Sequence, residues 1–302
     1  MLDFLGKTAI VTGGTRGIGA ACARMLYRRG ADVVLTYVSD TAAAEAFEAE
    51  LAASARGGAG DTSGGAGDTP GGKPGDTPGG TSGGPPGDAP DGPPGDTSGE
   101  APNDVPCGRV FTFRADIADV REIERLIGFV SERFGGLDIL VNNAGVLQST
   151  AIGDMTEEEW DRVIDVNLKG VFFMTQKALP LMEARGGGKV VNVTSLAGRN
   201  GGFVNGLAYT ASKAGVVGLT KGFASRLAPL GVRVNAVAPG TTETDILKNI
   251  SDEKMAGLLT KIPAGRLGRP EEIAAAVVFL CSDEADFITG AVLDINGGMY
   301  FA

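Results

Sequence analysis

Tyr209 and Lys213 are the residues of this sequence best suited to acid–base chemistry. They stand four positions apart in the segment "YTASK", so a helix would place both side chains on one face. A free tyrosine titrates near pH ~10, but a neighbouring ammonium group favours the phenolate and lowers its pKa. The pair could therefore give and take a proton at neutral pH. Taken alone, the same spacing is also typical of an ordinary amphipathic surface helix.

The 302-residue chain contains no histidine, which narrows the chemistry. Ser-His-Asp hydrolysis, histidine-ligated zinc and histidine general bases are excluded, so tyrosine, lysine, cysteine or carboxylate groups must move protons. The three cysteines, Cys22, Cys107 and Cys281, show neither CxxC nor metal-site spacing. That pattern predicts reduced thiols, a cytoplasmic protein and no bound metal. The chain shows no basic patch, secretory signal or 18-residue apolar run, so neither nucleic acid nor a membrane is expected as partner.

A glycine-rich turn near the start of the chain predicts a dinucleotide site. The segment "TGGTRGIG" carries Gly13, Gly17 and Gly19 between an apolar run and a helical pattern. Glycines at such a position allow a tight turn, a close approach of the backbone to a pyrophosphate, and a helix N-terminus directed at the anion. A glycine-rich turn alone is weak evidence, and its position after the first strand strengthens it.

The residues near the end of the second predicted strand favour NADP(H) over NAD(H). An NAD site usually places a carboxylate there to bind the ribose 2′-hydroxyl, whereas this chain has Tyr37. Arg16 in the glycine turn could bind a 2′-phosphate, and Ser39 could add a hydroxyl. The alternative is that Arg16 is a solvated loop charge and that Asp40 binds the ribose.

The elements that must position these residues alternate along the chain as strand and helix. Short, continuously apolar strands separated by helical patterns predict a parallel sheet covered on both faces, a doubly wound (Rossmann) α/β fold of about seven strands. Thr156 with Glu159 three residues later predicts a capping box at the start of one helix. The predicted strands are Lys7–Thr12, Ala31–Tyr37, Arg109–Asp116, Leu137–Gly145, Lys189–Ser195, Val232–Gly240 and Ala291–Gly297.

Residues 57–108 interrupt this pattern with repeated Gly-Asp-Thr units. Ten of the fifteen prolines fall here, and seven Asp and one Glu against Lys73 give the segment a net charge of −7, out of −10 for the chain. Such a composition cannot build a core, so it predicts a disordered loop inserted between the second helix and third strand of one domain spanning residues 1–302. A docking role for this acidic loop stays open.

Six motifs resemble the short-chain dehydrogenase/reductase family, and they occur in that family's order. They are "TGGTRGIG", "NNAG", "VNLKG", "NVTS", "YTASK" and "VAPGTTETD", and the resemblance covers the chain apart from the insertion. The C-terminal segment beginning "GRLGRPEEIAAAVVFL" is similar to 3-oxoacyl-carrier-protein-reductase-like members. The sugar epimerase and dehydratase branch is disfavoured, because those relatives are longer and have a different glycine spacing.

The resemblance implies a role for each catalytic residue. Tyr209 would pass a proton to the substrate oxygen, Lys213 would lower the pKa of Tyr209 and bind the nicotinamide ribose, and Ser195 would polarise the substrate oxygen. Asn167 would hold a water that links Lys213 to solvent. Ser195 and Tyr209 are fourteen residues apart where many members have thirteen, and Thr194 is a rival for the role of the serine.

The resemblance also implies which residues bind the cofactor. The glycine turn would hold the pyrophosphate, residues after the second to fourth strands would hold the adenosine, and residues after the sixth strand would form the nicotinamide pocket. The predicted cofactor-binding residues are Gly13, Thr15, Arg16, Gly17, Ile18, Gly19, Tyr37, Ser39, Asp116, Ile117, Asn142, Ala144, Gly145, Tyr209, Lys213, Pro239, Gly240, Thr242 and Thr244.

These inferences predict an NADPH-dependent ketone reductase, or the reverse secondary-alcohol dehydrogenase. A 3-oxoacyl group on acyl carrier protein is one candidate substrate, and a free ketone, sugar or polyketide is another. The alternative from a different class is a catalytically idle NADP(H)-binding sensor or scaffold, which typically lacks the Tyr or the Lys. The apolar segment "EEIAAAVVFLCS" favours self-association, by resemblance a homotetramer, although it could equally be core.

Overall fold

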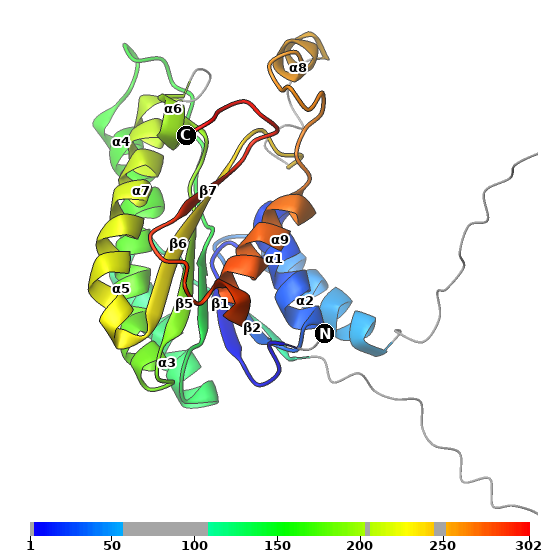
Figure 1. Cartoon of the computed structure of the whole chain (residues 1–302), viewed down its shortest axis with the longest axis vertical. Helices are drawn as coiled ribbons and strands as arrows, with labels where there is room; N and C mark the ends of the chain where they lie inside the picture. The colour runs from blue at the N-terminus through cyan, green and yellow to red at the C-terminus, as the bar shows by residue number, and fades with distance from the viewer. Residues whose placement is uncertain (1–2, 57–107, 203–205, 245–251) are drawn as a thin grey trace, which may run out of the picture.

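Seven parallel strands form one sheet in the order β3-β2-β1-β4-β5-β6-β7 (Figure 1). The computed structural model describes residues 3–56, 108–202, 206–244 and 252–302. The strands are β1 Thr8–Val11, β2 Asp32–Tyr37, β3 Val110–Arg114, β4 Ile139–Asn142, β5 Gly188–Val193, β6 Val232–Pro239 and β7 Val292–Ile295. The prediction of a doubly wound sheet of about seven strands is therefore confirmed.

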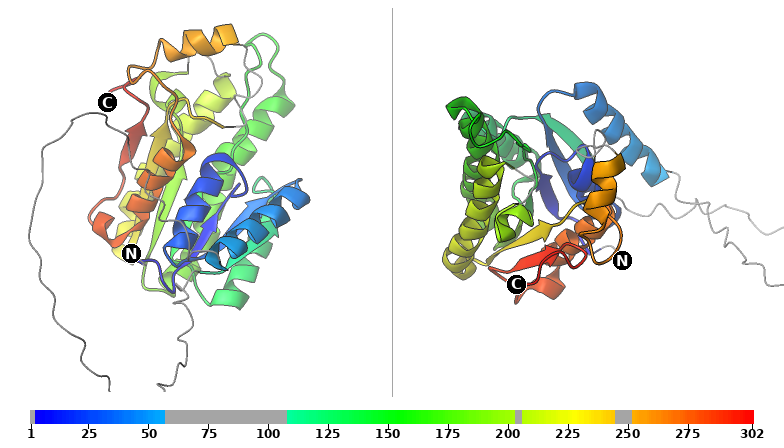
Figure 2. Two further views of the ribbon diagram at one scale, coloured as in Figure 1. Left: turned by 90° about the vertical axis from the view of Figure 1, so that its right-hand side faces the viewer. Right: turned by 90° about the horizontal axis from the view of Figure 1, so that it is seen from above.

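Helices cover both faces of this sheet (Figure 2). In the described part of the chain they are α1 Gly17–Arg28, α2 Thr41–Arg56, α3 Val120–Phe134, α4 Glu157–Ile164, α5 Gly170–Glu183, α6 Ala197–Asn200, α7 Leu207–Leu227, α8 Asp252–Leu259 and α9 Pro270–Cys281. A π-helical turn, η1, spans Asp165–Lys169 between α4 and α5. Short 3-10 turns, η2 Ala228–Leu230 and η4 Asp283–Ala285, follow α7 and α9.

The two layers of helices enclose two apolar cores, because successive strand residues point to opposite faces of the sheet. Val11 belongs to the core beneath α1, α2 and α9, whereas its neighbour Ile10 belongs to the core beneath α3, α5 and α7. The central strands are apolar on both faces, as the sequence predicted for a sheet covered on both sides.

Local signals explain how several helices begin and end. Thr156 caps α4 by accepting a hydrogen bond from the backbone N–H of Glu159, 3.2 Å. Only this half of the predicted capping box forms, because the Glu159 carboxylate accepts from Thr150 Oγ1 instead, 3.2 Å. Helix α3 starts at a capping Asp119 and ends at Gly135, whose φ of 70° lies in the left-handed region that favours glycine.

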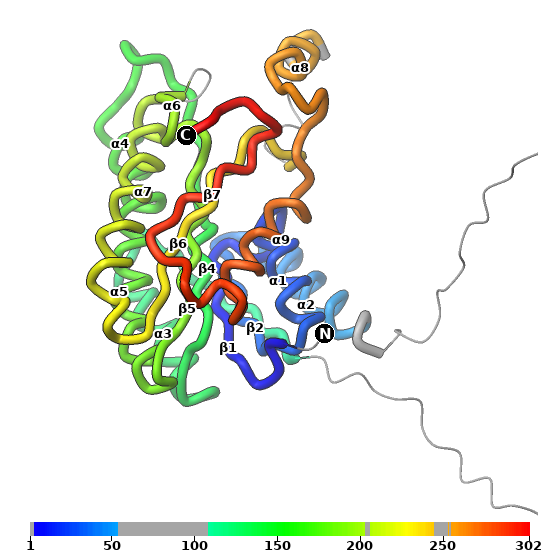
Figure 3. Tube along the Cα trace, viewed as in Figure 1, coloured from blue at the N-terminus to red at the C-terminus, as the bar shows by residue number. Residues whose placement is uncertain are grey.

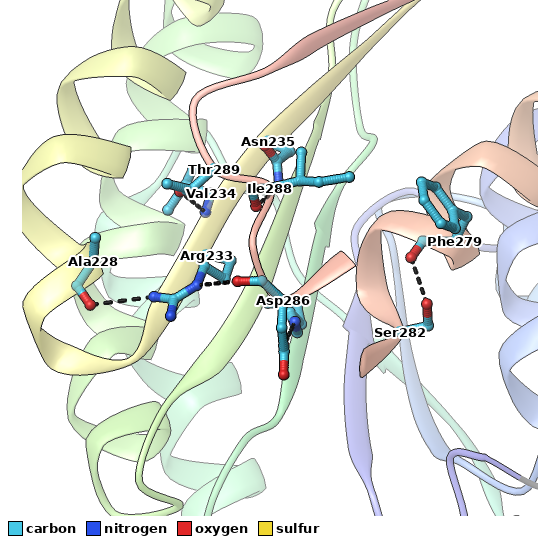
Figure 4. Close-up of polar contacts among 10 residues, drawn as sticks. Ala228, Arg233, Val234, Asn235, Phe279, Ser282, Asp286, Ile288 and Thr289 are labelled. Atoms are coloured by element: carbon cyan, nitrogen blue, oxygen red, sulfur yellow. Dashed lines mark hydrogen bonds and ion pairs between the residues drawn. The ribbon is translucent and has the colours of Figure 1, made fainter. Parts of the chain in front are cut away.

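Side-chain hydrogen bonds fix the connection between α9 and β7 against β6 (Figure 4). Arg233 donates to the carbonyl oxygens of Asp286, 2.7 Å, and Ala228, 3.2 Å. Asn235 donates to the carbonyl oxygen of Ile288, 2.8 Å. These contacts hold the connection between α9 and β7 at the amino edge of the sheet, and the C-terminal segment then runs to the carboxyl edge (Figure 3).

The insertion joins α2 to β3, and residues 57–107, predicted to be disordered, lie outside the described residues. The described chain resumes at Gly108, where a Cβ atom would stand 1.7 Å from the carbonyl oxygen of Ala31. Since Ala31 directly precedes β2, this attachment lies at the amino edge of the sheet. β3 pairs with β2, so the insertion does not link two separate sheets.

Candidate active site

The predicted motifs meet at the carboxyl edge of the sheet. The glycine turn follows β1, the "NNAG" segment follows β4, Ser195 follows β5, and the "APG" segment ends β6. Because neighbouring strands run parallel, their carboxyl ends open at one edge, where α/β proteins bind ligands. The insertion attaches at the opposite edge.

The glycine turn has the backbone geometry that only glycine tolerates well. Gly13 and Gly17 have φ of 61° and 54°. At Gly19 a Cβ atom would stand 2.3 Å from the carbonyl oxygen of Gly13. Each of the three predicted glycines is therefore required by this turn, either by its φ value or by close packing.

The N-terminus of α1 is suited to an anion. Arg16 occupies the N-cap position without a side-chain capping bond, and the first turn holds no acidic residue. The exposed Arg16 side chain has no hydrogen-bond or ion-pair partner among the described residues. Unpaired N–H groups and the helix dipole both favour a bound phosphate there, so the turn fits a dinucleotide. Thr15 is partly exposed beside Arg16, and Ile18 packs against the core.

Asn143 supports this turn, although the predicted site residues of the "NNAG" segment are its neighbours Asn142, Ala144 and Gly145. Its Nδ2 donates to the carbonyl oxygens of Thr12, 2.9 Å, and Gly13, 3.0 Å. Thr12 Oγ1 in turn accepts from the N–H groups of Asn143, 2.9 Å, and Ala144, 3.0 Å. A Cβ atom on Gly13 would stand 3.0 Å from Cα of Ala144, so Ala144 lies beside the turn.

The side chain of Asn142 points away from the turn, which corrects the expectation that it lines the site. It is buried and donates to Thr175 Oγ1, 3.2 Å, and Asn192 Oδ1, 2.9 Å. Asn142 is the last residue of β4, and the period of two along a strand directs its side chain into the α5 layer. The next residue, Asn143, is the one directed at the glycines.

The predicted adenosine residues lie at the ends of β2 and β3. Tyr37 is half-buried at the last position of β2, and Ser39 is exposed two residues later. Asp40 Oδ1 accepts from the N–H of Ala43, 2.9 Å, so this carboxylate caps α2. Asp116 Oδ1 accepts from the N–H of Ala118, 3.0 Å, and the neighbouring Ile117 is buried against Gly170.

The residues predicted for the nicotinamide pocket follow β6. A Cβ atom on Gly240 would stand 2.8 Å from Cα of Asn296, so only glycine fits without displacement there. Thr242 Oγ1 donates to the carbonyl oxygen of Gly240, 3.2 Å, and Thr244 packs over Gly17 of the glycine turn. A cavity of about 140 Å³ lies beside this loop, lined by Thr241, Ile262, Ala264, Arg266, Leu267, Gly268, Glu272, Ile273, Ile295, Asn296 and Gly297.

Helix α7 carries both Tyr209 and Lys213, as their spacing predicted. Lys213 is only 5% exposed, and its Nζ donates to the carbonyl oxygen of Val193, 2.9 Å. The same ammonium lies 5.8 Å from the centre of the Tyr209 ring. Burial lowers the pKa of Lys213 to about 8, because desolvation disfavours the charged form. Gly145 leaves room beside Lys213, since a Cβ there would lie 3.5 Å from Nζ.

The pKa of Tyr209 differs from the expectation that Lys213 lowers it. Burial raises the pKa of this phenol, and a side-chain hydrogen bond with Ser195 only partly offsets that effect. The reason is desolvation, which disfavours the phenolate just as it disfavours the ammonium of Lys213. Tyr209 is therefore protonated at neutral pH in this structure.

The structure separates Ser195 from its rival Thr194. Thr194 is buried, and its hydroxyl donates to the carbonyl oxygen of Lys213, 2.7 Å. Ser195 lies close enough to Tyr209 for its side chain to favour the phenolate and so lower the pKa of Tyr209. Its Oγ also accepts from the N–H of Ala197, 3.1 Å, which leaves the hydroxyl hydrogen available for donation. The fourteen-residue spacing thus still brings serine and tyrosine together.

Asn167 lies in the π-helical turn η1 and is fully buried. Its Nδ2 donates to the carbonyl oxygen of Val146, 3.0 Å, and to Ser212 Oγ, 3.1 Å, while its Oδ1 accepts from the N–H of Val146, 2.8 Å. The Ser212 hydroxyl donates a hydrogen bond to the backbone carbonyl oxygen of Tyr209, 2.7 Å. Asn167 therefore ties the loop after β4 to the helix that carries Tyr209.

The described residues offer no group of three or more His, Cys, Asp or Glu side chains placed to hold a metal ion. Within the same ranges, none of the helices combines the length and apolar character needed to cross a membrane.

Comparison with known proteins agrees with this geometry. A family model described as short chain dehydrogenase matches residues 7–63, and one described as enoyl-(acyl carrier protein) reductase matches residues 99–300. The 3-oxoacyl-[acyl-carrier-protein] reductase FabG of Staphylococcus aureus is 38% identical over 97% of this chain and 98% of its own length. Its counterpart in Escherichia coli is 35% identical over 99% of each chain.

Two solved structures are also similar. One is a short chain dehydrogenase from Burkholderia cenocepacia in complex with NADP, with a TM-score of 0.76 and 29% identity over 98% of this chain and 99% of the other. Another is a short-chain dehydrogenase/reductase, glucose/ribitol dehydrogenase, from Brucella melitensis, with a TM-score of 0.74 and 30% identity over 99% of each chain.

A parallel sheet, a glycine turn after its first strand and a half-buried Tyr209 beside the buried Lys213 define an NAD(P)-dependent oxidoreductase. The chain belongs to the short-chain dehydrogenase/reductase family, as the near full-length matches show. The predicted family and class of enzyme are confirmed.

Proposed function

We propose that this enzyme reduces a ketone with NADPH, or oxidises the corresponding secondary alcohol, and that Tyr209 is the proton donor. The observation that carries the proposal is the pair of Tyr209 and Ser195 hydroxyls at the carboxyl edge of the sheet, with the Lys213 ammonium beneath the tyrosine ring. A protonated phenol is the state that a donor needs at the start of a reduction.

The described side chains support a division of labour in that reaction. Ser195 would donate a hydrogen bond to the carbonyl oxygen, which stabilises the negative charge that develops there. Tyr209 would then transfer its proton to the same oxygen. When bound, the nicotinamide supplies the hydride.

Lys213 would stabilise the tyrosinate that this transfer leaves. With a pKa of about 8, its side chain is mostly an ammonium at neutral pH, and an opposite charge so close favours the phenolate at the moment when it forms. Asn167 would position the loop after β4 and α7. The π-helical turn around it supports the further proposal that its backbone binds a water leading from Lys213 to solvent, since such turns are frequent at functional sites.

NADP(H) is the cofactor we propose. Tyr37 replaces the carboxylate of an NAD site, Asp40 is engaged in capping α2, and Arg16 has a free guanidinium at the N-terminus of α1. The complex of the Burkholderia cenocepacia relative with NADP supports the same cofactor. The side chains that would hold it are those of the glycine turn and of the loops after β2, β3, β4 and β6.

The names of the relatives favour a 3-oxoacyl thioester on acyl carrier protein as the substrate. The chain would act in the cytoplasm as a homotetramer. Large apolar side chains on and after α9 support self-association, because Phe279, Phe287, Leu293 and Phe301 are exposed in the isolated chain.

Substrate-panel kinetics test this proposal. Purified protein is mixed with NADPH and either a 3-oxoacyl thioester of acyl carrier protein, the matching N-acetylcysteamine thioester or small ketones, and NADPH absorbance is followed. We expect turnover of the thioesters and a higher kcat/KM with the carrier. Tight NADPH binding without turnover of any carbonyl or alcohol would instead support the idle sensor, whose typical loss of Tyr or Lys this chain does not share.

A further inference from the structure

Arg114 ends β3 beside the residues proposed to hold the adenosine. In the parallel pairing of β2 with β3, Arg114 stands directly opposite Tyr37, the residue that replaces the carboxylate of an NAD site. Both positions are at the carboxyl edge of the sheet. None of the six motifs that carry the family resemblance includes Arg114, so the resemblance implies no role for it.

The face on which Arg114 lies follows from its neighbour on the same strand. Thr112, two residues earlier, donates from its N–H, 3.0 Å, and from Oγ1, 2.7 Å, to Glu48 Oε2 of α2. Because residues two apart on a strand share a face, Arg114 lies on the side of the sheet covered by α1 and α2. That is the side on which α1, with its open N-terminus, follows the glycine turn.

One hydrogen bond fixes the guanidinium of Arg114 against the turn after β2. Its Nε donates to the carbonyl oxygen of Val38, 3.0 Å, directly before Ser39. The side chain is exposed, and its two Nη groups have no hydrogen-bond or ion-pair partner among the described residues.

Two carboxylates of this region, Asp40 before α2 and Glu48 on α2, are already engaged. Asp40 caps the helix through Ala43, and Glu48 accepts from Thr112. Arg114 thus brings a positive charge and two free donor groups to the end of β2, with its orientation set by the backbone.

We infer that Arg114 binds the 2′-phosphate of NADP(H) together with Arg16 and so helps the enzyme to select NADP(H) over NAD(H). The inference rests on the proposed function, whose cofactor it makes specific. A phosphate dianion is best matched by a planar guanidinium that can offer two parallel N–H groups. Two arginines from different elements, one at each side of Tyr37 and Ser39, give the phosphate two such partners.

Equilibrium binding tests this role without turnover. The dissociation constants of NADP+ and NAD+ are measured by calorimetry for the parent enzyme, Arg114→Ala and Arg114→Lys. We expect Arg114→Ala to weaken NADP+ binding by about tenfold, the scale of one charge-assisted hydrogen bond at an exposed site, and to leave NAD+ binding unchanged. Arg114→Lys keeps the charge without the planar fork and is expected to lie in between.

Arg133→Ala is the matched control. Arg133 is another exposed arginine, in the last turn of α3 at the amino edge, where it stacks on Phe111. It should leave both constants unchanged. If the parent prefers NADP+ and Arg114→Ala keeps that preference undiminished, or weakens both nucleotides equally, the inference about Arg114 is wrong and the proposed cofactor stands. A parent enzyme without any preference for NADP+ would overturn both.

Discussion

The carboxyl edge of the sheet has a catalytic end around Tyr209 and Lys213 and an adenosine end around Arg16 and Arg114. The two ends differ in how far their charged and polar groups are exposed to water. At the catalytic end, Lys213 and Asn167 are buried and hydrogen-bonded to backbone carbonyl oxygens, and desolvation lowers the pKa of Lys213 and raises that of the half-buried Tyr209. Around Arg16 and Arg114, the charged groups are exposed, so water and salt screen them. We therefore expect single changes to be severe at the catalytic end and graded at the adenosine end.

The largest effect is expected from Tyr209→Phe. Removing the hydroxyl removes the proton donor, and general acid catalysis of this kind contributes roughly 10²–10⁴ in rate. We expect kcat to fall by about 10³ while the dissociation constant of NADPH, measured by its fluorescence, changes little because the ring remains. Near-normal turnover would overturn the assignment of Tyr209 as donor.

Ser195→Ala should cost about 10² in kcat, because one hydrogen bond to the developing oxyanion is lost. Thr194→Val is its matched partner one residue away. Its hydroxyl donates to the backbone of Lys213, so its loss should lower thermal stability by about 1 kcal/mol and leave kcat within several-fold. Steady-state kinetics and thermal melts of both variants separate the two hydroxyls, and the reverse order of effects on kcat would make Thr194 the catalytic residue.

The pH dependence of reduction should reflect Lys213. Its pKa is lowered to about 8, so the ammonium is present below that pH and is lost as pH rises through it. Since the ammonium stabilises the forming tyrosinate, kcat at saturating NADPH should be level near pH 7. It should then fall by up to tenfold per pH unit above about 8. A profile that stays flat to pH 9.5 would contradict this role for Lys213.

The smallest effect is expected at the opposite edge of the sheet. Deleting residues 58–103 removes most of the insertion, whose attachment beside Ala31 is at the amino edge. We expect kcat/KM to stay within a few-fold of the parent value, and the deletion chain should melt at a similar or higher temperature, because closing a shorter loop costs less entropy. A collapse in activity would mean that the insertion acts on the site.

The order of the elements and of the motifs was determined by the sequence alone. Apolar runs and helical periodicity predict seven parallel strands, and a parallel sheet requires that segments following its strands open at one edge. The resemblance of six motifs to the short-chain dehydrogenase/reductase family predicted that the glycine turn, Ser195 and the Tyr209–Lys213 pair belong to one site. The three-residue spacing of Thr156 and Glu159 likewise predicted the cap at the start of α4.

Tertiary structure decided which way side chains point and how much water they lose. Asn142 and Asn143 are identical in type and adjacent, yet the pleat of β4 sends one into the core and the other to the glycine turn. Arg114 lies beside Tyr37 only because β3 pairs with β2, and an insertion of some fifty residues separates the two positions in the sequence. The raised pKa of Tyr209 comes from desolvation in the folded chain, which has no local signature in the sequence.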